Sequence, residues 1–532
     1  MIRTGAVIAA VVLALALPVA GAFGQPGAPM EEGKLLIAAE LVLDGDVAHR
    51  DFEHFYGPGD VWAVAAAFAT IGHSVDAERL LGVAYFALLV VSVFAFARRA
   101  GRVPAALAAI ASGWLLVPFG VHAYSWTAGL ALLLAATATV LSLSRDAHRG
   151  PSRGKAVVAG ALAGLAILFR ADLVIAVGLV GAIVWPALDR RQRLDGLIGG
   201  AVAGGLPYLA HLVTEGPSAM WRGMVTDSVF RLRDGRALPV PPPAGGLTAW
   251  LDISAPEPRP SAWLPDPARV TQLRAFFWLT ALAVIALVIV GVAALVRRWQ
   301  PARWLACLGA IAVAISPQML QRADATHVRF VACLVLPLAP VALAVAWRAI
   351  DPKLPVAAVA TQAVLMTMAA VFLVVPYYAA RLPAATIDVD AHEIDFDGRS
   401  FPANERLAAD ASAVLELVDD VAPADANTVF VGPKDLRLAN YSDAFLYFLL
   451  GARFEPASFY LESNPGIANA KDSTLAADLA RADLLILSGE YDNWDEPNTS
   501  RVQGPAAPLA VVADRFCLAG EAGRYDVYFR CE

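Results

Sequence analysis

The chain has 532 residues, 58% of them hydrophobic, and its mean hydropathy is +0.57. A soluble protein with 17% charged residues could not bury so much apolar surface, so the composition excludes a wholly soluble chain and indicates an integral membrane protein. The formal net charge is −7, and the last ~150 residues hold about two acids for each base, so we expect no nucleic-acid partner.

Apolar segments long enough to cross a bilayer recur through residues 1–376, since one such helix needs about 20 mostly apolar residues. The first segment ends in small residues, as a cleaved signal peptide does, but we favour a retained span. We predict about 11 spans, at 5–23, 79–97, 103–120, 125–143, 156–170, 172–187, 195–213, 273–296, 303–319, 329–348 and 355–376. The segments 156–170 and 172–187 are short, and one long tilted helix is the alternative there.

Basic residues occupy every second connection between these segments, as they do in cytoplasmic loops. They include Arg98, Arg99, Arg102, Arg145, Arg149, Arg153, Lys155, Arg190, Arg191, Arg193, Arg297, Arg298, Arg303, Arg348 and Lys353. An odd number of spans with a cytoplasmic N-terminus predicts a multi-pass protein of the cytoplasmic (plasma) membrane with an extracytoplasmic C-terminal domain. The loops 24–78, 214–271 and 320–328 would share that outer side.

The first outer loop, 24–78, carries two adjacent glutamates, Glu31 and Glu32, at the start of "EEGKLLIAAELVLDG". The apolar side chains of this stretch form one helical face, at Leu35, Leu36, Ala39, Val42 and Leu43. This pattern predicts a short helix along the membrane surface that ends at Gly45. A second short helix is predicted from Pro58, and the turn between the two could bring Asp51 toward the glutamates.

Further charged residues lie at span ends on the same predicted side. They are Arg170 and Asp172 in "ILFRADLV" and Arg322, Asp324 and His327 in "SPQMLQRADATHV". Ionisable groups are costly near lipid, so their gathering indicates a water-filled cavity with a function. The structural alternatives are that the acids of a first helical turn favour the helix dipole and that arginine snorkels to the interface. Carboxylates beside arginines suit a transfer in which an acid deprotonates a hydroxyl while cations hold a departing phosphate.

Together these stretches resemble the GT-C superfamily of polytopic glycosyltransferases, which includes the protein O-mannosyltransferases and the lipid A aminoarabinose transferase. The resemblance rests on "EEG" at 31–33, "GDVAHRDFEHFYGPG" at 45–59, "LFRADL" at 168–173 and "LQRADATHV" at 320–328. It implies a polytopic α-helical membrane protein with a C-terminal extracytoplasmic α/β domain. The implied activity is inverting transfer of a sugar, a hexose or pentose, from a polyprenyl-phosphate carrier to a glycan, lipid or protein acceptor of the cell envelope.

The resemblance also implies roles for individual residues. Glu31 or Glu32 would be the base and Asp51 the second acid of the loop, and these three carboxylates could hold Mg²⁺ or Mn²⁺ or act without a metal. The residues near the carrier phosphate would be Arg50, Arg170, Asp172, Arg322, Asp324 and His327. Two positions depart from the family pattern, since Glu31 stands at a usual aspartate and His49 at a usual tyrosine.

The loop 214–271 contains "SAMWRGMVTDSVFRLRDG", which predicts an amphipathic helix with Trp221 and Phe230 in the membrane interface. The prolines of "LPVPPPAGG" that follow favour a stiff, extended path. We interpret this loop as a flap over a groove for the lipid carrier, with a plain connector as the alternative.

The final region, 377–532, alternates buried-strand runs such as "TVFVG" and "DLLILSG" with helical patterns near 404–419 and 474–482. This alternation predicts a small soluble α/β domain after a transmembrane domain at 1–376. A closing hairpin could bring Cys517 and Cys531 together, as a disulfide in an oxidising compartment or as two free thiols.

Two other classes of function stay open beside the transferase. Scattered charges near spans also mark transporters or flippases of lipid-linked precursors, although the sequence lacks a clear repeat of two halves. A non-catalytic membrane protein that binds envelope glycans is the third class. The sequence has no zinc-ligand spacing, no glycine loop for nucleotide phosphates and no nucleophile elbow, which argues against cytosolic nucleotide sugars or ATP as substrates.

Overall fold

The computed structural model describes residues 4–143, 153–242, 269–375, 391–439, 442–490, 496 and 498–531. The chain divides into two compact units, each assembled from three separate segments. The helical unit comprises Met1–Phe23, Gly82–Ala210 and Pro239–Asp388, and the α/β unit comprises Gly24–Leu81, His211–Leu238 and Val389–Glu532. The loop after the first span therefore groups with the C-terminal region, whereas the sequence analysis placed it in a transmembrane domain at 1–376.

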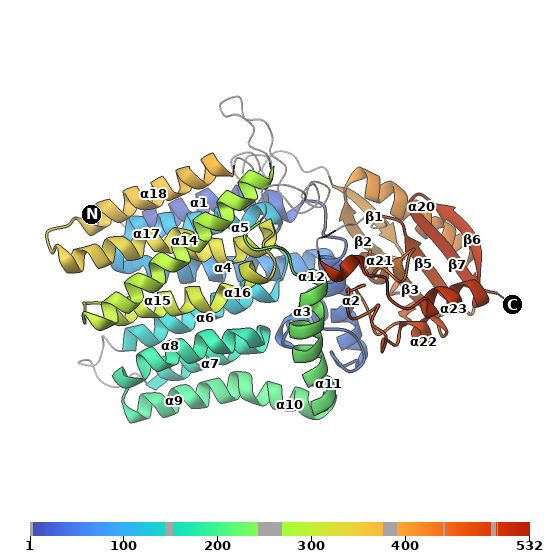
Figure 1. Ribbon diagram of the computed structural model, residues 1–532, viewed down its shortest axis with the longest axis horizontal. Helices are drawn as coiled ribbons and strands as arrows, with labels where there is room; N and C mark the ends of the chain where they lie inside the picture. Colours follow the sequence, from blue (N-terminus) through green and yellow to red (C-terminus); the bar gives the residue numbers. More distant parts are fainter. Residues whose placement is uncertain are drawn as a thin grey trace. The chain divides into compact units, whose positions relative to one another are not determined.

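The helical unit is built from apolar helices (Figure 1). They are α1 (Thr4–Phe23), α4 (Val75–Ala97, which begins in the α/β unit), α5 (Arg102–Leu116), α6 (Ser125–Leu143), α7 (Arg153–Phe169), α8 (Val174–Val184), α9 (Arg190–Gly200), α10 (Leu206–Glu215, which ends in the α/β unit), α14 (Arg269–Val296), α15 (Ala302–Ile315), α16 (Pro317–Gln321), α17 (Ala325–Ile350) and α18 (Val356–Val374). In the described part of the chain, eight helices are long and apolar enough to span a membrane. The shorter apolar helices Arg102–Leu116 and Ala171–Ala187 fall below that length, so the predicted 11 spans stay a prediction.

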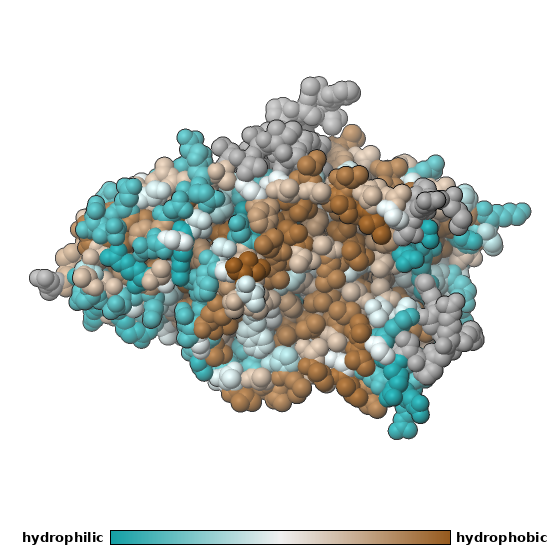
Figure 2. All heavy atoms as spheres, turned by 180° about the vertical axis from the view of Figure 1, so that it is seen from behind, coloured by the Kyte–Doolittle hydropathy of each residue, from teal (hydrophilic) through white to brown (hydrophobic). Residues whose placement is uncertain are grey.

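Helix α17 is apolar around its whole circumference and is buried along most of its length among α5, α14 and α18. By contrast, α14 exposes large apolar side chains such as Leu282, Ile285 and Ile289. A helix that is apolar on all sides and still exposed suits a lipid surrounding. On the face seen in Figure 2, hydrophobic side chains cover much of this unit.

Helices α7 and α9 approach each other closely because glycines line their contact. A Cβ atom added to Gly160 would collide with the carbonyl oxygen of Gly196, and one added to Gly199 would collide with that of Val157. Small residues at such spacing let the backbones of membrane helices touch.

The chain breaks between α7 and α8, where the sequence allowed either one helix or two. Arg170 has an extended backbone, and a short 3₁₀ turn, Ala171–Leu173, follows before α8 begins. The structure therefore has two helices in this stretch.

The α/β unit contains a five-stranded sheet with the order β4-β3-β5-β7-β6. Its strands are β3 (Thr428–Pro433), β4 (Glu455–Pro456), β5 (Leu484–Ser488), β6 (Phe516–Ala522) and β7 (Tyr525–Arg530), and β1 (His392–Phe396) pairs with β2 (Arg399–Ala403) as a separate hairpin. Strands β4, β3 and β5 are parallel, whereas β7 runs antiparallel to β5 and to β6. The predicted α/β fold of the C-terminal region is thereby confirmed.

Helices pack around this sheet (Figure 1), and a disulfide closes its last hairpin. The helices are α20 (Glu405–Val421), α21 (Phe445–Leu450), α22 (Leu475–Leu479) and α23 (Ala507–Arg515). Cys517 on β6 is bonded to Cys531 after β7, with 5.3 Å between their Cα atoms.

The two helices of the loop 24–78 have the predicted bounds but a different environment. Helix α2 spans Glu31–Asp44 and ends at Gly45, whose φ of 105° only glycine adopts easily; α3 spans Gly59–Ile71 after Pro58. However, α2 is not a helix with a single buried face. Leu36 through Leu41 are all buried, because α3 and α21 pack against it and Glu40 binds Arg399. Packing by α21, which lies far away in the sequence, explains why more of α2 is buried than its sequence pattern predicts.

The predicted amphipathic helix of the loop 214–271 is present as one helical run. It comprises α11 (Pro217–Trp221), a π-helical stretch at Arg222–Arg231 and α12 (Leu232–Arg236). Trp221 and Phe230 are both exposed on it. The remainder of the proposed flap, 243–268, lies outside the described residues.

Candidate functional site

The tripeptide Arg-Ala-Asp occurs twice in the helical unit and adopts the same local structure each time. Each copy directly follows the last residue of a helix, α7 or α16. Arg170 has φ −141° and ψ 100°, and Arg322 has φ −142° and ψ 104°. In both copies the arginine Nε donates to the aspartate two residues later, at 2.9 Å to Asp172 and 2.7 Å to Asp324. The ion pair within each copy fixes the direction of its guanidinium group.

Further contacts connect the two copies. Gln318 of α16 donates its side-chain amide to Asp172 at 3.3 Å. Asp324 caps α17 by accepting from the backbone N–H of His327 at 2.7 Å, and it lies 2.8 Å from Nδ1 of the same histidine. Burial alone would raise the pKa of Asp324, but His327 and Arg322 together hold it well below its ordinary value. The contact from Gln318 to Asp172 links the two copies, and we call Arg170, Asp172, Arg322, Asp324 and His327 together the Arg-Ala-Asp cluster.

Glu32 and Arg79 form a buried ion pair within the α/β unit. Arg79 donates to the two carboxylate oxygens of Glu32 at 2.7 and 3.0 Å, and the backbone N–H of Ala28 donates at 3.2 Å. Glu32 is 0% exposed and Arg79 is 2% exposed. Glu31, the first residue of α2, is instead exposed. Of the two adjacent glutamates, Glu31 is therefore the one that solvent reaches.

Asp51 pairs with its neighbour Arg50. Arg50 donates from Nε and Nη2 to the two carboxylate oxygens of Asp51 at 2.9 and 2.6 Å, and the N–H of Val47 donates at 2.8 Å. The hydrogen bond from Arg50 lowers the pKa of Asp51, so this carboxylate is a weak base. Arg50 also donates to the carbonyl of Thr214 at 2.9 Å. The partners of Asp51 thus lie in its own turn, whereas the sequence analysis pointed it toward Glu31 and Glu32.

The α/β unit contains a polar cluster of its own, which was not predicted from the sequence. Glu462 accepts from Lys34 and from Arg236, each at 2.7 Å, and Asn464 donates to Glu53 at 3.4 Å. Burial raises the pKa of Glu53 to about 8. Burial would also raise the pKa of Glu462, but Lys34 and Arg236 outweigh it and lower that pKa to about 2. These residues come from α2, its following turn, α12 and the C-terminal region, and no local pattern in the sequence connects them.

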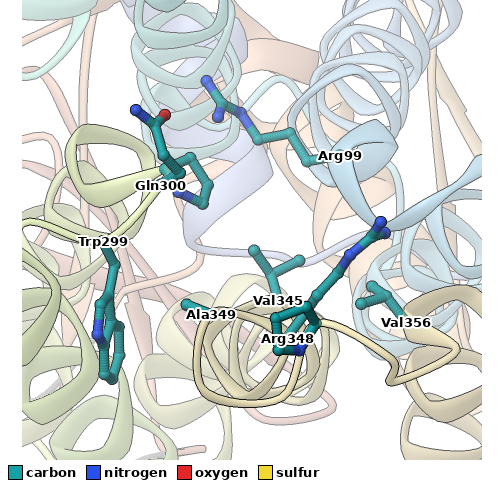
Figure 3. A pocket seen from close by; sticks show the side chains of 9 residues that line it. Arg99, Trp299, Gln300, Val345, Arg348, Ala349 and Val356 are labelled. Carbon is teal, nitrogen blue, oxygen red and sulfur yellow. The ribbon is translucent and has the colours of Figure 1, made fainter.

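The helical unit has an apolar pocket and a more polar one. The apolar pocket has a volume of about 520 Å³ and lies among α6, α7, α8 and α9, with residues such as Leu133, Val180 and Tyr208 in its wall. The polar pocket has a volume of about 680 Å³ and includes Arg99 and Arg348 (Figure 3). Arg348 lies near the end of α17 opposite the Arg-Ala-Asp cluster. This 26-residue helix is about 39 Å long, so the polar pocket is separate from that cluster.

Comparisons with known proteins identify the fold. No protein-family model matches the sequence, and no curated protein matches it. The structure is similar to a crystal structure of ArnT from Cupriavidus metallidurans bound to undecaprenyl phosphate, with 14% sequence identity and a TM-score of 0.53 over 99% of this chain and 98% of that chain. An apo structure of the same protein gives 12% identity and a TM-score of 0.48. The first of these similarities shows that the chain has an ArnT-like polytopic fold, as the sequence predicted.

Proposed function

We propose that the protein is a membrane glycosyltransferase that moves a sugar from a polyprenyl-phosphate carrier to an acceptor in the cell envelope, with inversion at the anomeric carbon. The observation that carries this proposal is the fold, which matches that of ArnT over nearly the full length of both chains. ArnT was crystallised with undecaprenyl phosphate, a polyprenyl phosphate of the proposed kind. The sugar is a hexose or a pentose, and the acceptor is a glycan, lipid or protein.

The Arg-Ala-Asp cluster is the proposed site for the carrier phosphate. Arg170 and Arg322 are only 8% and 5% exposed, and each is oriented by its own aspartate. As the sugar leaves, negative charge grows on the phosphate, and a fixed cation in a poorly hydrated site stabilises that charge strongly. His327 lies beside Asp324 and would donate a further hydrogen bond to the phosphate.

The apolar pocket among α6, α7, α8 and α9 supports a carrier with a hydrocarbon chain. Its wall consists almost wholly of apolar and small side chains, with glycines from α7 and α9. Such a surface gains free energy by covering hydrocarbon and offers little to a hydrophilic solute. We propose that part of the polyprenyl chain lies there.

Glu31 is the proposed base. Its carboxylate is exposed at the first turn of α2, where it could accept the proton of the acceptor hydroxyl as that oxygen attacks the anomeric carbon. Glu32 would hold the first turn of α2 through Arg79, and Asp51 would hold Arg50. Because Glu32 and Asp51 already bind arginines, these carboxylates fit Mg²⁺ or Mn²⁺ poorly, and we propose transfer without either ion at this place.

A transfer assay tests this proposal. Proteoliposomes with the purified chain would receive a panel of polyprenyl-phosphate sugars together with an envelope extract as acceptor. We expect one carrier to lose its sugar and release polyprenyl phosphate, and Arg322→Gln to slow this release while the variant still folds. Movement of intact carrier across the bilayer with no release would instead identify a transporter. Absence of both activities with every carrier would refute the proposal.

A further inference from the structure

Three buried side chains outside the Arg-Ala-Asp cluster form a compact group in the α/β unit. His49 lies in the turn between α2 and α3, and His211 and Glu215 lie one turn apart on α10. Nδ1 of His49 is 3.2 Å from Nε2 of His211. The Glu215 carboxylate lies 2.8 Å from His211 Nε2 and 3.5 Å from His49 Nδ1. All three side chains are at most 1% exposed.

A backbone carbonyl determines the tautomer of His49. Nε2 of its ring lies 3.1 Å from the carbonyl oxygen of Tyr56. A carbonyl can only accept, so Nε2 carries the proton and Nδ1 presents its lone pair to His211 and Glu215. Histidines that bind metals are typically oriented in this way, with the second ring nitrogen donating to a carbonyl or carboxylate.

The polar partners of the Glu215 carboxylate are the two histidine rings, 2.8 and 3.5 Å away. Neither of its oxygens receives a hydrogen bond of ordinary geometry in the described structure, although both are fully buried. A buried carboxylate without such bonds is costly, and a bound cation would compensate both its charge and its lone pairs.

The chain also holds His49 in a strained position. Its φ is 68°, in the left-handed region that few residues other than glycine adopt. Gly223 of the helical run after α10 packs against the imidazole so closely that an added Cβ would overlap the ring. Arg222 donates to the backbone carbonyl of His49 at 3.2 Å. Strain of this kind persists mainly at functional positions.

We propose that His49, His211 and Glu215 bind one divalent transition-metal ion, for which Zn²⁺ is the best match. Two imidazole nitrogens and one carboxylate form a typical zinc set, with ligand distances of about 2.0–2.1 Å. At those distances, nitrogens 3.2 Å apart subtend an angle of about 100° at the ion, close to tetrahedral. A water would complete the coordination.

The ion would join two segments that lie far apart in the sequence, since His49 and His211 are separated by 162 residues. It would stabilise the turn that carries Arg50 and Asp51 against the end of α10. The inference of this site comes from the geometry of its three ligands and does not depend on the proposed transferase activity.

Metal analysis of the untagged, full-length protein in detergent tests the inference. The chain would be stripped with a chelator, reloaded with Zn²⁺ and assayed for bound metal and for thermal unfolding. We expect about one Zn²⁺ per chain and a higher melting temperature with the ion than without it. Glu215→Gln and His211→Ala should bind Zn²⁺ at least ~100-fold more weakly. His73→Ala is the matched control and should bind like the native chain, because His73 is half-exposed and lies outside the cluster.

Two results would overturn the site. One is a native chain that binds no Zn²⁺ and melts at the same temperature with and without it, as a buried histidine–glutamate ion pair would. The other is undiminished binding by folded Glu215→Gln and His211→Ala. If these variants fail to fold, Co²⁺ added to the native chain decides: we expect the visible absorption of a tetrahedral ion with nitrogen and oxygen ligands, and a spectrum of octahedral Co²⁺ would contradict the site.

Discussion

Two adjacent glutamates at the start of α2 differ in exposure, and we propose that one is structural and the other takes part in the reaction. Glu32 is fully buried against Arg79, whereas Glu31 is exposed. Removing one partner of a buried ion pair lowers the free energy of unfolding by about 3–5 kcal/mol, because the other charge stays buried without a partner. We therefore expect Glu32→Gln to lower the melting temperature clearly.

Glu31→Gln should behave in the opposite way. We expect its melting temperature to stay close to that of the native chain and its sugar transfer to fall by roughly 10²–10⁴-fold, the usual contribution of a general base. Parallel thermal unfolding and transfer assays on the two variants check this. Equal losses of stability in both variants, or full activity of folded Glu31→Gln, would contradict the assignment.

Glu53 provides a prediction about pH at the same scale. Burial raises its pKa from 4.5 to about 8, so the folded state binds this proton more tightly than the unfolded state does. The resulting stabilisation is fully present below pH 4.5 and is lost as the pH rises through about 8. Glu53→Gln imitates the protonated acid and should reduce the fall in melting temperature between about pH 5 and 8.

The matched control for Glu53 is Asp472→Asn. The hydrogen bond from Arg231 lowers the pKa of Asp472, so its contribution changes only at more acidic pH and the variant should keep the native slope. An unchanged slope in Glu53→Gln would show that Glu53 is ionised in the folded protein.

At the scale of single elements, close contact between α7 and α9 depends on glycine. Gly160→Ala would place a methyl group against the carbonyl of Gly196, and we expect a loss of about 1–3 kcal/mol from this overpacking. Gly178→Ala in α8 is the control, because no atom lies within 4 Å of the added Cβ and alanine favours helix. Unfolding of both variants in detergent should show a loss only for Gly160→Ala. Equal stability of the two would mean that the helices are farther apart.

The elements whose ends have local signals were predicted from the sequence. Gly45 and Pro58 fix the bounds of α2 and α3, and the charged tripeptide at Arg170 marks the break between α7 and α8. The burial of α2 was not predicted, because it depends on α21, about 400 residues later in the chain. For the same reason the difference between Glu31 and Glu32 was invisible, since Arg79 approaches from another helix.

At the scale of the whole molecule, segments far apart in the sequence form side-chain contacts that no local sequence pattern predicts. Lys34 and Glu462 are 428 residues apart, and His49 and His211 are 162 residues apart, yet each pair is in direct contact. Periodicity and charge reveal which segments are helices or spans, but they carry no information about which polar loops meet. The class of fold therefore followed from the sequence, whereas both buried polar clusters of the α/β unit required the structure.

The disulfide between Cys517 and Cys531 tests where the α/β unit lies in the cell. Such bonds persist in oxidising compartments, so the predicted extracytoplasmic position requires this one to be formed in cells. It closes a loop with a sequence separation of 14, and Cys517→Ser with Cys531→Ser should cost about 3 kcal/mol in the chain-entropy description. Cys307 and Cys333 are free but buried, so they should not react in the folded protein.

Labelling of intact cells then decides the orientation. After treatment with a membrane-impermeant phosphine, a membrane-impermeant maleimide should modify Cys517 and Cys531, and without the phosphine it should modify neither. The double serine variant is the control and should stay unlabelled under both conditions. A cytoplasmic α/β unit would give a different pattern, with labelling only after the membrane is broken and no need for reduction, because cytosolic thiols are kept reduced. That pattern would invert the topology and, with it, place the Glu31 carboxylate on the wrong side for an envelope acceptor.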